Sequence, residues 1–194
     1  MFRSITFATL VLACAPLYAV TYTLDPQHTG GVIRWSHPGF ANPTAQFNLV
    51  EGTLEFDATD PGKSSVMVTI PVAALSTGVP DLDVDFRSAD FFNVPQFPTA
   101  TFRSAKVEKL VVADHLKVTG DLSLRGLTKP VTLDVTINKV GIDSRNKLPT
   151  VGFDATATVD RSDFGLGLYV PLVSDEIRIH ITGKRPSLRA MPSG

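Results

Sequence analysis

Hydrophobic and polar residues alternate along most of this chain with the two-residue period of β-strands. In "HLKVTGDLSLRG", residues 115–126, Leu116, Val118, Leu122 and Leu124 alternate with polar neighbours. This pattern is typical of a strand with one buried and one solvated face. The same alternation recurs at residues 66–70, 131–137, 151–159 and 177–181. The chain is therefore predicted to be nearly all β.

Turn-forming segments separate these runs, as in "DPGKS", "RGLTKP" and "DSRNKLP". Their spacing is typical of consecutive antiparallel strands. The segment "PDLDVDFRSADFF", residues 80–92, predicts the one short helix, with Asp81 as its cap.

One-sided strands must bury their apolar faces against each other, in a sandwich or in a closed barrel. Long runs at residues 44–57, 99–112 and 129–142 favour the barrel. We predict a single all-β domain, an eight-stranded antiparallel barrel with one short helix. A barrel of this size is either filled by its own side chains or holds one small ligand. The small residues Ala155 and Ala157 on one face favour an internal apolar cavity.

The chain ends add a prediction about location. Residues 1–19 combine Arg3, an apolar run and Ala19, which predicts a cleaved signal peptide and a periplasmic protein. The run is too short for a membrane span and contains Pro16. Cys14, the only cysteine, is not expected to be lipidated, so the mature protein has no disulfide. The barrel is assigned to residues 20–185 and a loosely ordered tail to residues 186–194.

Charge and candidate chemistry narrow the function classes. With 18 Lys+Arg against 19 Asp+Glu, the chain is not expected to bind nucleic acid. Its four histidines lack zinc-like spacing, so no metal or cofactor is predicted, although Asp25 and His28 can pair in a local turn. Ser162 in "DRSDFG" lacks a nucleophile elbow, and a structural turn explains it better. We predict no catalytic residues and therefore a binding protein rather than an enzyme.

Several segments, in order, resemble the YceI-like, polyisoprenoid-binding proteins. The resemblance runs from Tyr22 to Ile181 through "YTLDPQH", "EGTLEFDATDPGKSSVMVTI", "STG", "RSADFFNVPQFPTATFRS", "VTGDLSLRGLTKPVTLDV", "GFDATATVDRSDFG" and "SDEIRIHI". It implies an exported, lipocalin-like barrel whose long apolar cavity accommodates an isoprenoid or another long-chain lipid. The chain departs from the family pattern at Asp85 and Phe86, where many members carry His-Leu. It also departs after His37, where it reads "PGFANPTAQF".

The phenylalanine-rich segment at residues 87–102 has two interpretations. It is either a loop that plugs the core or a lid over the ligand site. In both, Pro95 and Pro98 are expected to keep the chain extended across one end of the barrel until a strand begins at Thr99.

The predicted ligand site combines inward-facing apolar residues with two polar ones. His37 shares a face with Trp35 and Ile33, so it is expected to hydrogen-bond a headgroup if that face points inward, and the alternative is a structural histidine. Arg161 is expected either to neutralise a phosphate or to pair with Asp175 or Glu176. The complete set is Trp35, His37, Phe47, Phe56, Val68, Phe91, Phe92, Phe102, Leu122, Leu124, Phe153, Arg161, Phe164, Ile177 and Ile179. Carrying or sequestering a long apolar lipid is the leading function. An enzyme acting on a lipid or quinone-like substrate and a ligand-free structural barrel remain alternatives, and the sequence leaves homodimerisation open.

Overall fold

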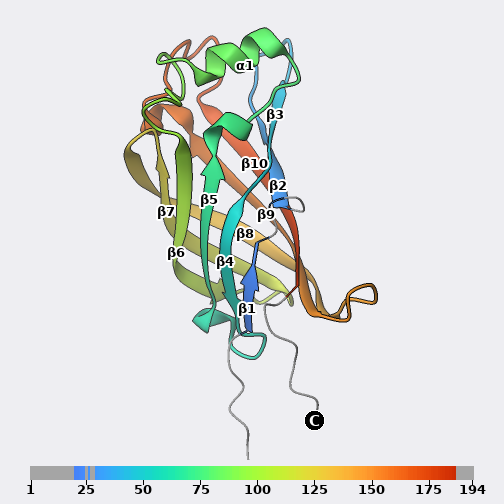
Figure 1. The fold of residues 1–194 in the computed structure, drawn as a ribbon. Helices are drawn as coiled ribbons and strands as arrows, with labels where there is room; N and C mark the ends of the chain where they lie inside the picture. The colour runs from blue at the N-terminus through green and yellow to red at the C-terminus, as the bar shows by residue number, and fades with distance from the viewer. Residues whose placement is uncertain (1–19, 25, 27–28, 187–194) are drawn as a thin grey trace, which may run out of the picture.

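A long antiparallel β-sheet curls around an apolar interior, and one helix lies across one end of it (Figure 1). The computed structural model describes residues 20–24, 26 and 29–186. The strands are β1 (Val20–Thr23), β2 (Thr29–Arg34), β3 (Thr44–Phe47), β4 (Glu51–Phe56), β5 (Ser65–Pro71), β6 (Thr99–Lys109), β7 (His115–Leu124), β8 (Leu127–Ile142), β9 (Pro149–Asp160) and β10 (Glu176–Pro186). The helix is α1 (Pro80–Arg87), and three short 3₁₀ turns are η1 (Pro61–Lys63), η2 (Val72–Ala74) and η3 (Arg161–Phe164).

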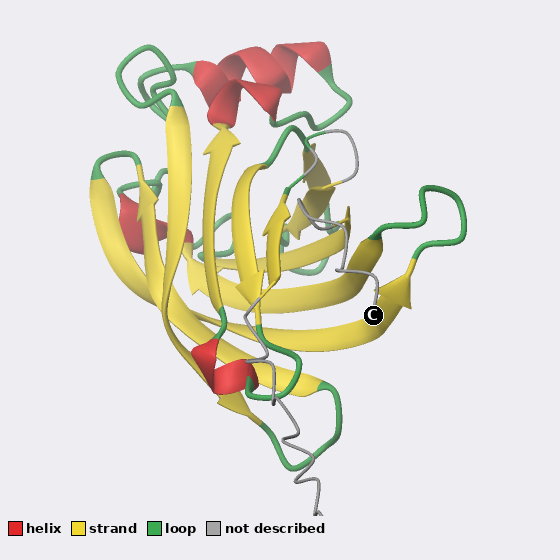
Figure 2. Ribbon diagram, turned by 60° about the horizontal axis from the view of Figure 1, so that its bottom comes forward, coloured by secondary structure: helices red, strands yellow, loops and turns green. Residues whose placement is uncertain are grey.

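The strand order is β1-β4-β5-β6-β7-β8-β9-β10-β2-β3, and neighbouring strands in this order pair antiparallel. The two ends of this order come from neighbouring parts of the chain. β1 continues towards β2, and β3 continues towards β4, so residues 20–34 and 44–56 form one long interrupted hairpin. In the half of this hairpin away from α1, β1 pairs with β4. In the half towards α1, β2 pairs with β3 (Figure 1). This hairpin joins β5 to β10 and curls the sheet into a barrel, as Figure 2 shows.

The described strands number ten, and the prediction of eight was wrong. The run predicted at residues 44–57 is divided because Leu49 has a left-handed backbone with φ of 59°. On the partner segment, Pro26 lies between β1 and β2 and has no N–H group to donate. The Leu49 N–H donates to the Pro26 carbonyl across the gap at 3.2 Å. The long strand predicted at residues 44–57 thus becomes two shorter ones, β3 and β4.

The inward faces follow the predicted alternation. Tyr22, Val151 and Phe164 are almost completely buried, at 2%, 0% and 1% exposure. They belong to a core cluster that also contains Leu116 and Val118 of β7. Most residues of the opposite parity on β7 and β9 are exposed or half-buried, and Thr150 of β9 is a buried exception. The barrel fold therefore rests on one apolar face per strand, as the sequence indicates.

The roof of the barrel is helix α1 with the loop that follows it. Pro80 occupies the first turn, where its missing N–H costs no hydrogen bond. Asp81 does not cap the helix, because Val79 stands at the cap position. Asp83 instead reaches back: its carboxylate accepts the backbone N–H of Thr77 at 2.6 Å and the hydroxyl of Ser76 at 2.8 Å. The bond from the Thr77 N–H is the main cause of a lowered pKa for Asp83. These contacts attach the helix to the segment leaving β5.

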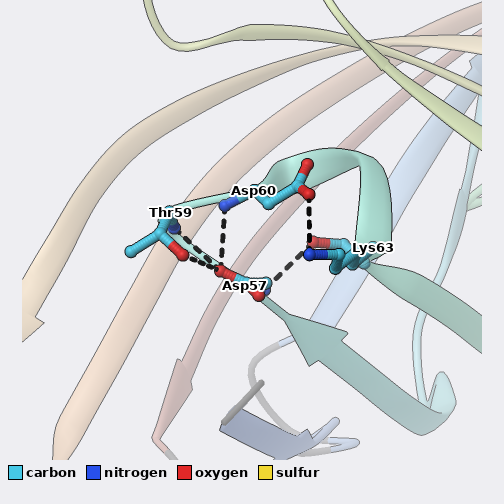
Figure 3. A network of polar contacts seen from close by, with 5 residues as sticks. Asp57, Thr59, Asp60 and Lys63 are labelled. Carbon is cyan, nitrogen blue, oxygen red and sulfur yellow. Dashed lines mark hydrogen bonds and ion pairs between the residues drawn. The ribbon is translucent and has the colours of Figure 1, made fainter. Parts of the chain in front are cut away.

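A polar turn closes the opposite end between β4 and β5, where "DPGKS" predicts it. Asp57 accepts hydrogen bonds from the N–H and hydroxyl of Thr59, at 2.9 and 2.6 Å, and from the N–H of Asp60 at 2.9 Å (Figure 3). The hydroxyl bond from Thr59 is the largest cause of the lowered pKa of Asp57. Lys63 pairs with Asp60 at 3.0 Å. This turn is an Asx-type structural feature.

Several predictions concern residues outside the described part of the chain. The signal peptide at 1–19, Cys14, the pairing of Asp25 with His28, and residues 187–194 of the tail all belong there. β10 extends to Pro186, one residue beyond the domain boundary set at residue 185. None of the helices in the described residues has the length and apolar character needed to cross a membrane.

Candidate functional site: an apolar cavity inside the barrel

The barrel encloses an elongated cavity of about 660 Å³. Residues from both ends contribute to its wall. At the end away from the helix, the buried side chains of Phe56, Val107 and Leu116 line it. At the helix end, exposed lining residues such as His37 and Tyr169 form a mouth that reaches solvent. The volume lies within the range of small-molecule sites, about 300–1,000 Å³.

The cavity wall is overwhelmingly apolar because almost every strand contributes its inward-facing hydrophobic residues. The polar or charged lining residues are few: Thr29, His37, Ser64, Ser65, Asp85, Ser88, Asp90 and Arg161. Most of this set lies at the helix end or at the turn before β5. The long middle of the cavity therefore offers only hydrophobic contact, which fits a hydrocarbon chain.

All fifteen residues of the predicted site lie on this wall. They are Trp35, His37, Phe47, Phe56, Val68, Phe91, Phe92, Phe102, Leu122, Leu124, Phe153, Arg161, Phe164, Ile177 and Ile179. Period-two alternation places the strand members of this set, because inward residues of a barrel share one parity on each strand. Their contact with a ligand remains a prediction.

Three glycines shape the cavity, and the sequence analysis missed them. A Cβ on Gly31 would lie 2.4 Å from the ring of Phe47, and one on Gly120 would lie 2.6 Å from the ring of Phe102. A Cβ on Gly183 would lie 2.7 Å from the ring of Phe153. Each ring thus lies over a glycine of a neighbouring strand, which lets it stay close to the wall. A glycine inside a strand pattern is a signal for such close approach, visible in "TGGVI", "VTGDL" and "ITGK".

Replacing Gly183 with alanine is expected to narrow the cavity with little loss of stability. The three atoms nearest to the new methyl group would all belong to the Phe153 ring, at 2.7–3.3 Å, and we expect this ring to move inward. We expect the dissociation constant for a long polyprenyl analogue to rise several-fold, while the denaturant midpoint falls slightly.

The matched control is Gly120→Ala, where the methyl group would lie 2.3 Å from the Arg103 carbonyl oxygen. The Arg103 carbonyl is part of the backbone and cannot rotate away from the new methyl group. The Gly120→Ala variant should therefore clearly lose stability. Equal stability losses in both variants would contradict this account of the Phe153 ring.

An aromatic cluster forms the inner surface of the roof. Phe86 lies at its centre, with ring centroids 5.7 Å from Trp35, 5.4 Å from Phe91 and 5.9 Å from Phe92. Tyr169 extends the cluster, 6.5 Å from Phe91. All five side chains line the cavity. Phe86, one of the departures from the family pattern, is therefore a cavity residue that the predicted set omits.

The phenylalanine-rich segment places its rings in two different surroundings, and which of its two predicted roles it serves remains a prediction. Phe91 and Phe92 line the cavity beneath the roof. Phe97 is not among the lining residues and packs over Gly126, where an added Cβ would lie 2.9 Å from its ring. β6 begins at Thr99 as predicted.

The expected extended crossing at Pro95 is wrong. Asn93 has a left-handed backbone with φ of 48°, and its carbonyl accepts the N–H groups of Gln96 and Phe97 at 2.9 Å. The Asn93 side chain also bonds Gln96 at 2.9 Å. Asparagine tolerates this conformation, so the segment makes a turn in which Pro95 takes part.

Arg161 holds the loop between η3 and β10. Its Nε donates to the Ser174 carbonyl at 2.9 Å, and its Nη2 donates to Val173 at 3.2 Å. Its Nη1 donates to Leu168 at 2.8 Å and also to Leu166. Four of the five guanidinium N–H groups therefore have carbonyl partners. The side chain lines the cavity mouth but is engaged mainly as a structural brace.

The surroundings of Arg161 are partly buried and contain Asp175. Burial lowers the pKa of Arg161, and the charge of Asp175 partly opposes this. Burial acts to raise the pKa of Asp175, but hydrogen bonds from Ser162 and the charge of Arg161 outweigh it, so that pKa is lowered. The Ser162 hydroxyl donates to Asp175 at 2.6 Å and its N–H does so at 2.8 Å. Ser162 therefore has the structural role that the sequence favours.

His37 is the remaining polar candidate of the predicted site. His37 is exposed at the mouth, and its backbone pairs with Ala41. Among the described residues, no group of three or more His, Cys, Asp and Glu side chains is placed to hold a metal ion.

These features define a lipocalin-like antiparallel barrel with an internal apolar cavity and a helical roof. The YceI-like domain family matches residues 22–184, and the chain belongs to that family. It is 34% identical to Protein YceI of Escherichia coli O157:H7 over 180 residues, which cover 92% of this chain and 93% of that protein.

Two solved structures share the fold. BcnA of Burkholderia cenocepacia superposes with a TM-score of 0.72 at 23% identity, over 80% of this chain and 95% of that one. A domain of Saccharophagus degradans, described as polyisoprenoid-binding and implicated in plant cell wall breakdown, gives a TM-score of 0.62 at 13% identity. That comparison covers 87% of this chain and 99% of the other.

Proposed function

We propose that this protein is an exported binding protein that holds a long-chain isoprenoid or similar lipid inside its barrel, as a carrier or by sequestering it. The observation that carries the proposal is the elongated apolar cavity of about 660 Å³ with its polar residues gathered near the ends. Family membership supports it, as does the description of the Saccharophagus degradans neighbour as polyisoprenoid-binding.

Energetics favour a long ligand. Each buried CH₂ group contributes about 0.8 kcal/mol, whereas association costs on the order of 4–15 kcal/mol. By these magnitudes, roughly fifteen buried carbons are needed for useful affinity. A polyprenyl or long acyl chain satisfies this requirement, and a small aromatic compound does not.

Binding is favoured over catalysis on a lipid or quinone-like substrate. Ser162, the serine weighed as a nucleophile from the sequence, donates its hydroxyl to Asp175 and is not among the lining residues. The middle of the cavity is lined by hydrocarbon side chains, which position a chain without activating it. Two observations together would support the enzyme hypothesis. The protein would turn over a lipid substrate with a pH-dependent rate, and a substitution at the cavity mouth would abolish that turnover.

The direct test is native mass spectrometry of protein purified from its own host. We expect a mass excess that organic extraction releases as a long-chain lipid, and the same spectrum reports the oligomeric state. Protein that carries no lipid, and that does not take up a polyprenyl analogue after delipidation, would contradict the proposal.

Export is proposed from the first nineteen residues, with their basic start and apolar run. Cell fractionation followed by N-terminal sequencing of the mature protein tests it. We expect periplasmic protein that begins after Ala19.

Replacing Phe92 with tryptophan should weaken ligand binding more than it weakens folding. Phe92 is half-buried, lines the cavity and contacts Phe86 edge to face at 5.9 Å. A larger ring there should occupy ligand space beneath the roof. Two measurements on the variant decide the matter: the denaturant midpoint without lipid, and the dissociation constant for a fluorescent polyprenyl analogue.

If Phe92 only filled a core, overpacking would cost about 1–3 kcal/mol of stability with no separate effect on binding. The control is Phe97→Trp, since Phe97 lies outside the lining. An unchanged dissociation constant with a lowered midpoint for the Phe92 variant would contradict the ligand role.

A further inference from the structure

The mouth of the cavity has an unusual charge arrangement for a site that would take a phosphorylated lipid. Among the described residues that line the cavity, Arg161 alone carries a permanent positive charge. Four of its five N–H groups donate to carbonyl oxygens of the loop at residues 166–174. A phosphate group bound there would have to compete with those carbonyls for its donors.

Two other arginines at this end of the barrel are also engaged with backbone. Arg87 donates to the carbonyl of Ala73 at 3.3 Å. Arg125 donates to the carbonyls of Gly165 and Ala89, at 2.7 and 2.9 Å. Neither side chain is among the cavity-lining residues. These two arginines thus connect the roof and its loops to neighbouring segments.

Negative charge, in contrast, lies directly on the mouth. Asp85 and Asp90 are exposed lining residues, and their carboxylates make no hydrogen bond or ion pair with any residue that the structure describes. Asp85 projects from α1, and Asp90 belongs to the loop that follows. An anionic headgroup at the mouth would be repelled by these two carboxylates. The neighbouring Arg161 has only one N–H group that does not already donate to a loop carbonyl.

The mouth does offer partners for an uncharged polar group. The imidazole of His37 and the hydroxyl of Ser88 line it alongside the amphipathic rings of Trp35 and Tyr169. These groups can donate to or accept from a hydroxyl or carbonyl oxygen without a charge being needed.

We infer that the cavity selects a long-chain lipid whose polar end is an uncharged hydroxyl or carbonyl group, and that it discriminates against the corresponding phosphate or diphosphate. This inference rests on the proposed lipid-binding function and specifies its substrate class. Two features carry the discrimination: the engagement of Arg161 with backbone, and the unpaired carboxylates of Asp85 and Asp90.

The test compares three ligands of one chain length: a polyprenol, its monophosphate and its diphosphate. Dissociation constants are measured on the delipidated full-length mature protein at about pH 8, where an ordinary imidazole is neutral. We expect affinity to fall from the alcohol to the monophosphate and again to the diphosphate. Discrimination should shrink at high salt, because exposed charges are screened.

The Asp85→Asn, Asp90→Asn double variant should narrow the gap between alcohol and diphosphate by about three- to fivefold, in line with interactions of exposed charges. Asp121→Asn is the matched control, since Asp121 is exposed and lies outside the lining. It should leave the gap unchanged.

The outcomes separate the two proposals. If the diphosphate binds as tightly as the alcohol, or more tightly, the inference is overturned while lipid binding stands. An alcohol preference that survives unchanged in the double variant would overturn the role given to the two carboxylates. If none of the three ligands binds, the proposed function itself fails, and the inference fails with it.

Discussion

Replacing Arg161 with methionine is expected to cost about 3 kcal/mol or more of stability, because four carbonyl oxygens lose a charged donor at once. Those carbonyls belong to Leu166, Leu168, Val173 and Ser174. The loop they form should become accessible to protease in the variant before the barrel unfolds. Denaturant unfolding and limited proteolysis measure the two effects.

The lysine variant makes this prediction specific. Arg161→Lys keeps the positive charge but replaces a planar fork of five donors with a single ammonium group, which cannot reach the same four oxygens. We therefore expect it to lose most of the stability lost by the methionine variant. Arg178→Met is the control, because Arg178 is exposed on β10 and bonds only the side chain of Glu176. Full stability in the lysine variant would show that charge, not the carbonyl contacts, is what position 161 supplies.

Replacing Val118 with aspartate should destabilise the barrel severely, by about 4 kcal/mol or more, because it buries a carboxylate without a partner. Val118 is 6% exposed, faces the cavity and packs in the core cluster. Its neighbour Thr119 points outward, where its hydroxyl lies 3.2 Å from that of Thr132. Thr119→Asp should therefore cost little.

Denaturant unfolding of both variants, followed by far-UV circular dichroism, checks the pair. The comparison tests the assignment of faces on β7 and, with it, the identity of the cavity wall. Similar midpoints for the two variants would mean that β7 does not present Val118 to the interior.

The strands show why alternation is informative in this chain. In β7, Leu116, Val118, Leu122 and Leu124 all line the cavity, as their spacing predicts. A strand places side chains on opposite faces with a period of two, so a one-sided pattern identifies the inner face without knowledge of the partners. The turn at "DPGKS" follows from a separate local signal, its turn-forming residues.

The interruption of this run leaves only a partial trace in the sequence. The apolar parity changes within residues 44–57, from Ala45 and Phe47 to Leu54 and Phe56. The alternation does not show that Leu49 takes the left-handed backbone that divides the run into β3 and β4. A leucine adopts that conformation only when its surroundings require it. Here the partner segment, with Pro26 at the gap, is brought alongside by the pairing of residues 20–34 with 44–56.

Local sequence rules therefore specify the all-β architecture, the inward-facing residues and the presence of a short helix near residue 80. Each of these follows from interactions between residues close in the chain. The three-dimensional arrangement specifies which aromatic ring lies over which glycine, as with Phe153 over Gly183. It also specifies that Arg161 donates to the carbonyl oxygens of one loop, and that the exposed Asp85 lies at the mouth of the cavity. These contacts join segments far apart in sequence, so their geometry arises only when the sheet curls and brings the strands and the roof together.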